Sequence, residues 1–316
     1  MRQAFRRAGE FLRCWCTSQA MTPRRAAIAA AFCLAYPLYW LVIKAGWILD
    51  GLRKLSPSDP PVIAPVFIVG SFRSGTTFLH RMLAQHPDLA TMQLWEILFA
   101  PSRSGREALS PLFHAFGGLR SSGTIHSTGW LEPEEDDYLH LFSFHALTVG
   151  MSSGLTELAA RHMDTTVDSS RERIDYYRRC ISRFLSLQPK GKRYLSKNPA
   201  LTPRMEAVAE AFPDARFVVI ERDPGEVLVS LSRMMRMTWR VIGTREDTPA
   251  RQRFLQELVS EFSRHPRRLA GGSLAGRIHF VPYRQLVENP QQVVAGVCAF
   301  CNLRDFEMHN LSDLQK

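Results

Sequence analysis

Residues 66–83 read VFIVGSFRSGTTFLHRML, and this stretch decides the fold class. Residues 66–69 form a short apolar run that ends at Gly70, which predicts a parallel strand buried on both faces. From Thr76 the pattern TTFLHRMLAQH predicts a helix. A tight loop therefore joins a strand directly to a helix.

The loop GSFRSGTT, residues 70–77, has the composition of an anion-binding loop. Backbone N–H groups and the positive end of the helix dipole face one point in such a loop, where they hold phosphate or sulfate. The P-loop pattern GxxxxGK[ST] matches at both glycines and at Thr77, but Thr76 replaces the lysine, and the basic group is Arg73. A kinase or hydrolase that uses ATP or GTP normally needs that lysine. The loop therefore predicts a phosphate site for a different ligand.

A second anion site is predicted at Arg222-Asp223-Pro224, which follows the β-rich run RFVVI at residues 216–220. The end of that strand brings Arg222 to the same sheet edge as the loop, and Ser230, about two helical turns on, can face back toward it. A guanidinium and a hydroxyl together can bind a second phosphate through charge and hydrogen bonds. A helix-start arginine alone more often pairs with a carboxylate, but its combination with the loop favours the phosphate site.

Further strands and helices alternate along the chain, which predicts a parallel sheet covered by helices on both faces. The predicted fold class is therefore α/β, a P-loop-like three-layer fold, preceded by an apolar N-terminal helix. Residues 93–165 are mostly helical by pattern, with Gly- and Ser-rich breaks. The other expected strands are residues 193–196 and 277–281, and the other expected helices are residues 171–187, 202–211, 224–237 and 291–300.

Two segments, PVFIVGSFRSGTTFLHRMLAQHP and RFVVIERDPGEVLVSLSR, resemble the 5′-phosphosulfate and 3′-phosphate motifs of sulfotransferases that use 3′-phosphoadenosine-5′-phosphosulfate (PAPS). The similarity is greatest to the bacterial sulfotransferase family, which is related to tyrosylprotein and Golgi carbohydrate sulfotransferases. Lys197-Asn198-Pro199 and VPYRQLVENP at residues 281–290 match as well. The resemblance implies transfer of sulfonate from PAPS to a hydroxyl of a glycan, lipid or small-molecule alcohol by in-line displacement, with adenosine 3′,5′-bisphosphate (PAP) as product and no metal.

The resemblance also implies a role for each matching residue. Tyr283 lines the nucleotide site, and Lys197 supports the cofactor or the leaving phosphate, with a surface salt bridge as its structural alternative. Arg222 and Ser230 hold the 3′-phosphate. The residues that hold the 5′-phosphosulfate are Arg73, Ser74, Gly75, Thr76 and Thr77.

The general base has two candidates. In the tyrosylprotein relatives a glutamate follows a His-Pro pair shortly after the first helix, and the resemblance places Glu96 there, after His86-Pro87. Glu96 is therefore the predicted base, a carboxylate that accepts the proton of the acceptor hydroxyl. The rival is the acidic run EPEEDD at residues 132–137, with His126 nearby. Most of that run suits a helix start, where acids interact well with the dipole.

Two other functions remain open. Residues 150–154 read GMSSG and match GxSxG, the nucleophile elbow of serine hydrolases, with FSFHALTV as a candidate strand before it. Such a hydrolase would use Ser152 and would leave the loop and Arg222 without a role. A non-catalytic nucleotide-binding protein tethered to a membrane would bind PAP without turnover.

The N-terminal segment, residues 1–60, is set apart from the predicted sulfotransferase domain, residues 61–316. The net charge is +10, and residues 1–54 carry nine Lys/Arg against two Asp/Glu, a net +7. This basic excess, next to the apolar run at residues 26–43, predicts contact with an anionic membrane and no nucleic-acid partner. Residues 51–65 are a Pro-rich linker.

The apolar run of 18 residues fits a spanning helix, an in-plane membrane anchor, or a helix packed on the domain. Its aromatic residues suit either a membrane interface or a groove on the domain: Tyr36, Tyr39, Trp40 and Trp47. The predicted localisation is at a membrane, with the catalytic domain in the cytoplasm. The alternatives are a soluble cytoplasmic protein and a single-pass protein with a lumenal domain. Cys298 and Cys301 lack partners for redox or zinc chemistry and are expected to be buried free thiols.

Overall fold

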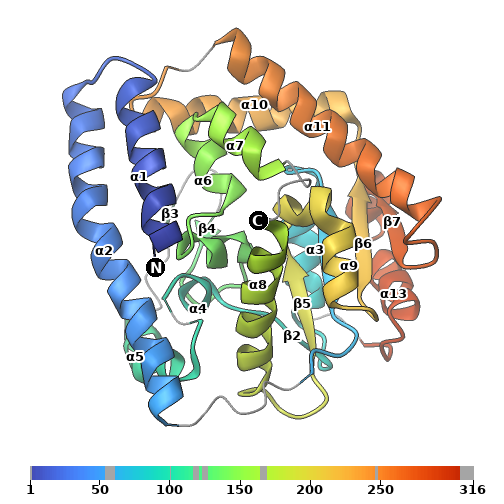
Figure 1. The fold of residues 1–316 in the computed structure, drawn as a ribbon. Coiled ribbons are helices and arrows are strands. Elements are labelled where there is room, and N and C mark those ends of the chain that lie inside the picture. The colour runs from blue at the N-terminus through green and yellow to red at the C-terminus, as the bar shows by residue number, and fades with distance from the viewer. Residues whose placement is uncertain are drawn as a thin grey trace.

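The computed structural model describes residues 2–53, 61–99, 101–116, 121–122, 127–163, 169–245 and 248–306. Figure 1 shows a central sheet with helices on both of its faces, and a pair of N-terminal helices along one side. Linker residues 54–60 and His126 lie outside the described residues. The predicted three-layer α/β architecture is confirmed.

Five strands form the central sheet in the order β2–β5–β1–β6–β7, and every pairing in it is parallel. In the middle strand, Phe67 pairs with Ser196 on one side and Phe217 on the other. The carboxyl ends of β1, β5 and β6 therefore meet at one edge, where open α/β sheets bind ligands. The strands are β1 (Val66–Gly70), β2 (Leu89–Ala90), β5 (Arg193–Lys197), β6 (Arg216–Glu221) and β7 (Ile278–Pro282). A separate antiparallel pair consists of β3 (Ser121–Ser122) and β4 (Ser127–Thr128).

Alternate residues of β1 enter two different hydrophobic cores. Phe67 and Val69 pack with α8 (Ser169–Leu185) and α9 (Met205–Ala211) on one face. Val66 and Ile68 pack with α3 (Thr76–Leu83) and α13 (Pro290–Phe300) on the other. This burial on both faces is the reason that the strand reads as an unbroken apolar run.

The remaining helices form the ends and the side of the molecule. A third core joins α6, α10 and α11 beside the sheet edge that carries the loop. The 22-residue helix α11 was not among the predicted elements. These elements are α4 (Leu94–Phe99), α5 (Arg103–Phe116), η1 (Asp136–Leu141), α6 (Leu147–Ser153), α7 (Thr156–Met163), η2 (Pro199–Arg204), α10 (Pro224–Val241), α11 (Pro249–Ala270) and α12 (Tyr283–Glu288), where η denotes a 3₁₀ helix.

The predicted helix at 202–211 begins as the 3₁₀ helix η2, which contains Pro199 and Pro203, and becomes α-helical only at Met205. Proline has no N–H group to donate to an α-helical ladder, which explains the tighter first turn. The predicted linker starts later than expected, because the N-terminal helix continues to Leu52.

Two N-terminal helices, α1 (Arg2–Thr17) and α2 (Pro23–Leu52), lie against the domain. One face of α2 is buried there, and a Cβ atom added to Gly46 would overlap Ser102 Oγ, so the glycine permits a close approach to the start of α5. The ring of Trp40 stacks on Phe142, and Trp47 lies under the guanidinium of Arg183. The aromatic residues considered for a membrane interface instead pack on the domain: Tyr36, Tyr39, Trp40 and Trp47.

The cysteine thiols of the core are free, as the sequence predicted. Cys298 and Cys301 are buried, and burial raises their pKa values to about 11 and about 12. Both thiols therefore stay protonated at neutral pH, which keeps them unreactive. Within the described ranges, no group of three or more His, Cys, Asp or Glu is placed to hold a metal ion.

Candidate active site

The predicted anion loop, residues 70–77, leaves the carboxyl end of β1 and enters α3. Gly75 has φ +95 and caps α3 without a side-chain hydrogen bond, so the N–H groups of the first turn face the loop. A Cβ atom on Gly75 would lie 3.1 Å from the ring of Tyr283. Inside the loop, Ser74 Oγ donates to the carbonyl of Ser71 at 2.7 Å, which holds its curvature.

Arg73 is the residue that joins the two predicted phosphate sites. Its backbone is left-handed, with φ +65, and its carbonyl accepts a 3.0 Å hydrogen bond from Arg222 Nη1. Its own Nε donates to Ser230 Oγ at 3.2 Å. Burial and the neighbouring Arg222 lower the pKa of Arg73. Two adjacent guanidinium groups repel each other, so this arrangement gains from an anion placed between them.

The motif RDP places Arg222 through its two neighbours. Asp223 is the N-cap of α10 and accepts a 3.0 Å hydrogen bond from the N–H of Glu226, while Pro224 occupies the first turn. Arg222 lies 4.3 Å from the ring centre of Tyr283 and pairs with Glu226 at 3.0 Å. The helix start thus fixes the arginine at the sheet edge beside the anion loop.

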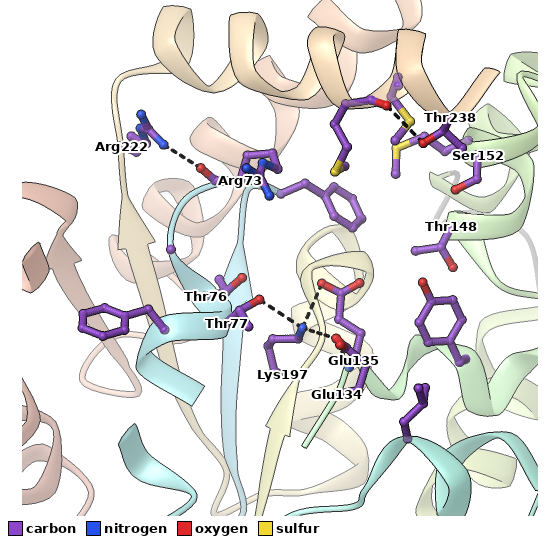
Figure 2. Close-up of a pocket in the computed structure, with 18 of the residues that line it drawn as sticks. Arg73, Thr76, Thr77, Glu134, Glu135, Thr148, Ser152, Lys197, Arg222 and Thr238 are labelled. Carbon is purple, nitrogen blue, oxygen red and sulfur yellow. Dashed lines mark hydrogen bonds and ion pairs between the residues drawn. The ribbon is translucent and has the colours of Figure 1, made fainter. Parts of the chain in front are cut away.

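Lys197, at the carboxyl end of β5, lies between the anion loop and two carboxylates, as Figure 2 shows. It is 1% exposed. Its Nζ is 2.6 Å from Glu134 Oε1, 3.3 Å from Glu135 Oε1 and 3.3 Å from Thr77 Oγ1. This lysine is therefore a buried bridge and not a surface salt bridge.

The two carboxyl groups have opposite pKa shifts. Burial is the largest effect on Glu135 and raises its pKa against the lowering effect of Lys197, while the charges of Glu134 and Asp137 add to the rise. For Glu134 burial acts in the same direction, but the charge and hydrogen bond of Lys197 prevail and lower its pKa. Burial also disfavours the ammonium of Lys197, yet the two carboxylates together raise its pKa. One site thus holds a strongly ionised carboxylate beside one that takes up a proton more easily.

The next two acids of the run hold the glutamates in place. Asp136 is buried and accepts hydrogen bonds from Tyr177 Oη at 2.6 Å, Tyr194 Oη at 2.8 Å and Asn198 Nδ2 at 2.8 Å. Burial raises the pKa of Asp136 to about 6. Asp137 pairs with the buried Arg173 at 3.0 Å. These contacts fix the start of η1 against β5, so that the preceding glutamates face the sheet edge.

A cavity of about 630 Å³ connects the anion loop with an apolar wall. Arg73, Thr76, Thr77 and Lys197 lie at one side of it, and Thr148, Ser152 and Thr238 lie across from them (Figure 2). We call this the catalytic cavity. Its apolar wall, the acceptor wall, consists of Leu94, Leu98, Leu141, Met151, Met234 and Met235.

A model of the sulfotransferase family matches residues 65–307. The chain belongs to the sulfotransferase family. It is 24% identical over 265 residues to the omega-hydroxy-beta-dihydromenaquinone-9 sulfotransferase Stf3 of Mycobacterium bovis and to that of Mycobacterium tuberculosis, and the match covers 80% of this chain. The chain spans 65% of the length of these relatives.

Two crystal structures of sulfotransferases share the fold of this chain. Sulfotransferase STF1 from Mycobacterium tuberculosis superposes with a TM-score of 0.72 at 19% identity, over 96% of this chain and 84% of that one. For STF9 from Mycobacterium avium the TM-score is 0.71 at 20% identity, over 92% of this chain and 76% of that one. The predicted fold and family are confirmed.

Glu96, the predicted base, does not face the catalytic cavity. Its Oε1 lies 3.2 Å from Arg106 Nε, and its Oε2 accepts a 2.8 Å hydrogen bond from the N–H of Gln93. Leu94 and Leu98, four residues apart on α4, both line the catalytic cavity. Glu96 lies halfway between them in sequence, so it projects from the opposite side of the helix, into a separate cavity beside Arg106.

The hydrolase alternative is wrong, because Ser152 lies within the helix α6. A nucleophile elbow needs a strand that turns sharply into a helix. Here α6 occupies residues of the expected strand, and Gly154, with φ +73, ends that helix. In the sulfotransferase fold Ser152 is instead a hydroxyl of the catalytic cavity, across from the anion loop.

Two parts of the site were not assigned from the sequence. The sequence identified Glu134 and Glu135 only as members of an acidic run. In the structure the two acids that follow them are held by buried contacts, and the two glutamates contact Lys197. Arg233 was not considered, yet it lines a groove together with Arg73, Arg222 and Ser230, which we call the arginine groove. Its position three residues after Ser230 on a helix was the available signal, since such residues share a face.

Proposed function

We propose that the protein transfers a sulfonate group from PAPS to a hydroxyl of an apolar acceptor and releases PAP. The observation that carries this proposal is the position of Lys197, between Thr77 of the anion loop and the carboxylates of Glu134 and Glu135. A donor on the loop and an acceptor against the apolar wall would meet at this point.

PAPS fits the two anion sites of the chain. The anion loop, with residues Arg73 to Thr77, would hold the 5′-phosphosulfate through backbone N–H groups. The arginine groove would hold the 3′-phosphate with Arg222, Ser230 and Arg233. ATP has no 3′-phosphate and leaves the second site without a ligand, which favours PAPS as the donor. Tyr283, beside Arg222, would line the nucleoside between the two sites.

The reaction is an in-line displacement at sulfur. The acceptor oxygen forms a bond to sulfur while the bond from sulfur to the bridging phosphate oxygen breaks, and the acceptor proton passes to a carboxylate. Lys197 and Arg73 would stabilise the charge that develops on the phosphate, as cations do in phosphoryl transfer. No metal takes part in these steps.

Glu135 is the carboxylate that we assign as the base. Its raised pKa brings its proton affinity closer to neutral pH, which improves proton transfer, whereas Lys197 holds Glu134 ionised. Glu134 then acts as the permanent counter-ion of Lys197. Glu96 is paired with Arg106 outside the catalytic cavity and takes no direct part.

The acceptor wall favours an alcohol on an apolar skeleton. Its leucines offer no hydrogen bonds, and its three methionines adapt to irregular shapes. Thr148 and Ser152 supply hydroxyls at the rim that would orient a polar end. The Stf3 relatives, whose name specifies an omega-hydroxy-beta-dihydromenaquinone, support an acceptor of this kind.

Titration calorimetry with PAP and with ATP tests the donor assignment. We expect PAP to bind more tightly than ATP. Arg222→Ala and Arg233→Ala should each lower the affinity for PAP by about 10- to 100-fold, since hydrogen bonds to charged groups contribute about 1.5–3 kcal/mol. Arg236→Ala, one turn further along α10 and outside the lining of the arginine groove, is the matched control. Equal affinities for PAP and ATP, unchanged by either variant, would refute the 3′-phosphate site.

A further inference from the structure

Helix α2 carries an apolar face that points away from the domain. Leu34 is 73% exposed, Leu38 65% and Leu52 75%. The spacing of these side chains places them on one side of the helix, over about 27 Å at 1.5 Å per residue. Figure 1 shows α2 as the outermost element at the left edge of the molecule. The large apolar residues of this face, the α2 stripe, are Leu34, Leu38, Leu41, Val42, Ile48, Leu49 and Leu52.

The opposite face of α2 is attached to the domain along its whole length. Near its start, the buried Arg25 donates to Thr244 Oγ1 at 2.9 Å. In its middle, Tyr36 Oη donates to the carbonyl of Phe142 at 3.2 Å. Near its end, the buried Asp50 accepts a hydrogen bond from the N–H of Ser104 at 2.7 Å. A helix held by buried charged groups at both ends is not surrounded by lipid, which argues against a spanning orientation even though its length and apolar composition would allow one.

The exposed charged residues of α2 are all basic. Asp50, the only acid in α2, is on the inner face. Arg6, Arg13, Arg24 and Lys44 are exposed, and among the described residues none of them forms an ion pair. The exposed side of α2 is therefore apolar with the basic Arg24 and Lys44 and no acid of its own, while Glu107 of α5 lies past its carboxyl end, paired with Arg53 at 2.9 Å.

We propose that the α2 stripe binds the surface of an anionic lipid bilayer, with α2 parallel to the membrane plane. A helix with one apolar face and basic flanks binds such a surface through apolar burial together with attraction to anionic headgroups. A second copy of the chain would bring the same basic groups against each other, which disfavours a dimer through this face.

The same geometry brings the membrane close to the acceptor. The ring of Tyr39, on α2, contacts Phe99 of α4 at 6.1 Å between ring centres. The other side of α4 carries Leu94 and Leu98 of the acceptor wall. The α2 stripe and the acceptor wall are therefore connected through the packing of α2 on α4, and we infer that an apolar alcohol dissolved in the bilayer would enter beside α4. This step rests on the proposed function, whereas the binding of the α2 stripe to lipid does not.

Flotation of the full chain with lipid vesicles tests the proposal. We expect the protein to float with vesicles of phosphatidylcholine and phosphatidylglycerol, less with phosphatidylcholine alone, and less at high salt. The double variant Leu38→Glu/Leu41→Glu should weaken vesicle binding by about tenfold or more, since it places two charges on the face that would enter the bilayer. Val287→Glu, at an exposed residue of α12, is the matched control and should float like the wild type.

A cooperative thermal unfolding transition, followed by circular dichroism on every variant, reports folding. PAP binding is measured separately, so that a failure of the proposed function is distinguished from a failure of this inference. The inference is overturned if the folded wild type does not float, or if the folded Leu38→Glu/Leu41→Glu variant floats as well as the wild type. Sedimentation velocity without lipid distinguishes the alternative occupant: a wild-type dimer that the double variant converts to a monomer would assign the stripe to a second copy of the chain.

Discussion

At the scale of single residues, the site depends on the different effects of one lysine on two neighbouring glutamates. Lys197 Nζ is closer to Glu134, at 2.6 Å, than to Glu135, at 3.3 Å. The nearer carboxylate is held ionised, and the pKa of the other is raised by burial. Proton uptake and charge neutralisation are thereby assigned to neighbouring residues, a division that sequence order alone does not reveal.

This division predicts the pH dependence of turnover. The base is active as a carboxylate, so kcat/KM should fall as pH drops through the pKa of Glu135, at a midpoint above the ordinary value of about 4.3 for glutamate. Lys197 lowers that pKa, so Lys197→Met should shift the acidic limb to higher pH and reduce the rate. A pH–rate profile of both proteins is the measurement. A limb at or below the ordinary value, or a shift to lower pH in the variant, would contradict the assignment.

At the scale of elements, the anion loop depends on one glycine at the start of α3. Gly75→Ala would force alanine into a left-handed backbone conformation, which costs about 1–2 kcal/mol of stability. The added Cβ atom would also lie against the ring of Tyr283. We expect a lower thermal unfolding midpoint and weaker PAP binding. Gly191, with φ +88 and no neighbour within 4 Å of an added Cβ atom, is the matched control. Gly191→Ala should lower the midpoint similarly and leave PAP affinity unchanged, whereas equal losses of affinity would refute a local role for Gly75.

The elements that were predictable are those whose signal is local. β1 with its loop, and β6 with Arg222, are continuous segments in which pattern and chemistry coincide, so the sequence predicted that these two segments meet at one sheet edge, as they do. The position of Glu96 outside the catalytic cavity was not predictable, because α4 is a short helix and no local pattern specifies that Leu94 and Leu98 are the residues that face the cavity. Glu135 was only a rival because its position depends on contacts of Asp136 with Tyr177 and Tyr194, from distant parts of the chain.

At the scale of the whole molecule, the sheet edge, the acceptor wall and α2 lie in that spatial order across the fold. In the proposed function the anion loop and the residues after β6 supply the donor site, and the residues just before η1 supply the carboxylates. The acceptor wall comes from α4, η1, α6 and α10. Helix α2, which carries the α2 stripe, is the outermost element at the left edge of Figure 1, and its Tyr39 contacts Phe99 of α4. The proposed reaction therefore requires segments that are distant in the chain to meet in one cavity, and Glu135 is one of the residues that line it.

The most direct test is the release of PAP from PAPS in the presence of a panel of apolar alcohols, for the wild type, Glu135→Gln and Glu96→Gln. We predict that the wild type sulfates at least one alcohol, and that Glu135→Gln loses about 10²–10⁴-fold in kcat while it still binds PAP, because it lacks the proton acceptor. Glu96→Gln should retain most of the rate. A Glu135→Gln variant that turns over like the wild type, with activity lost in Glu96→Gln, would contradict the account.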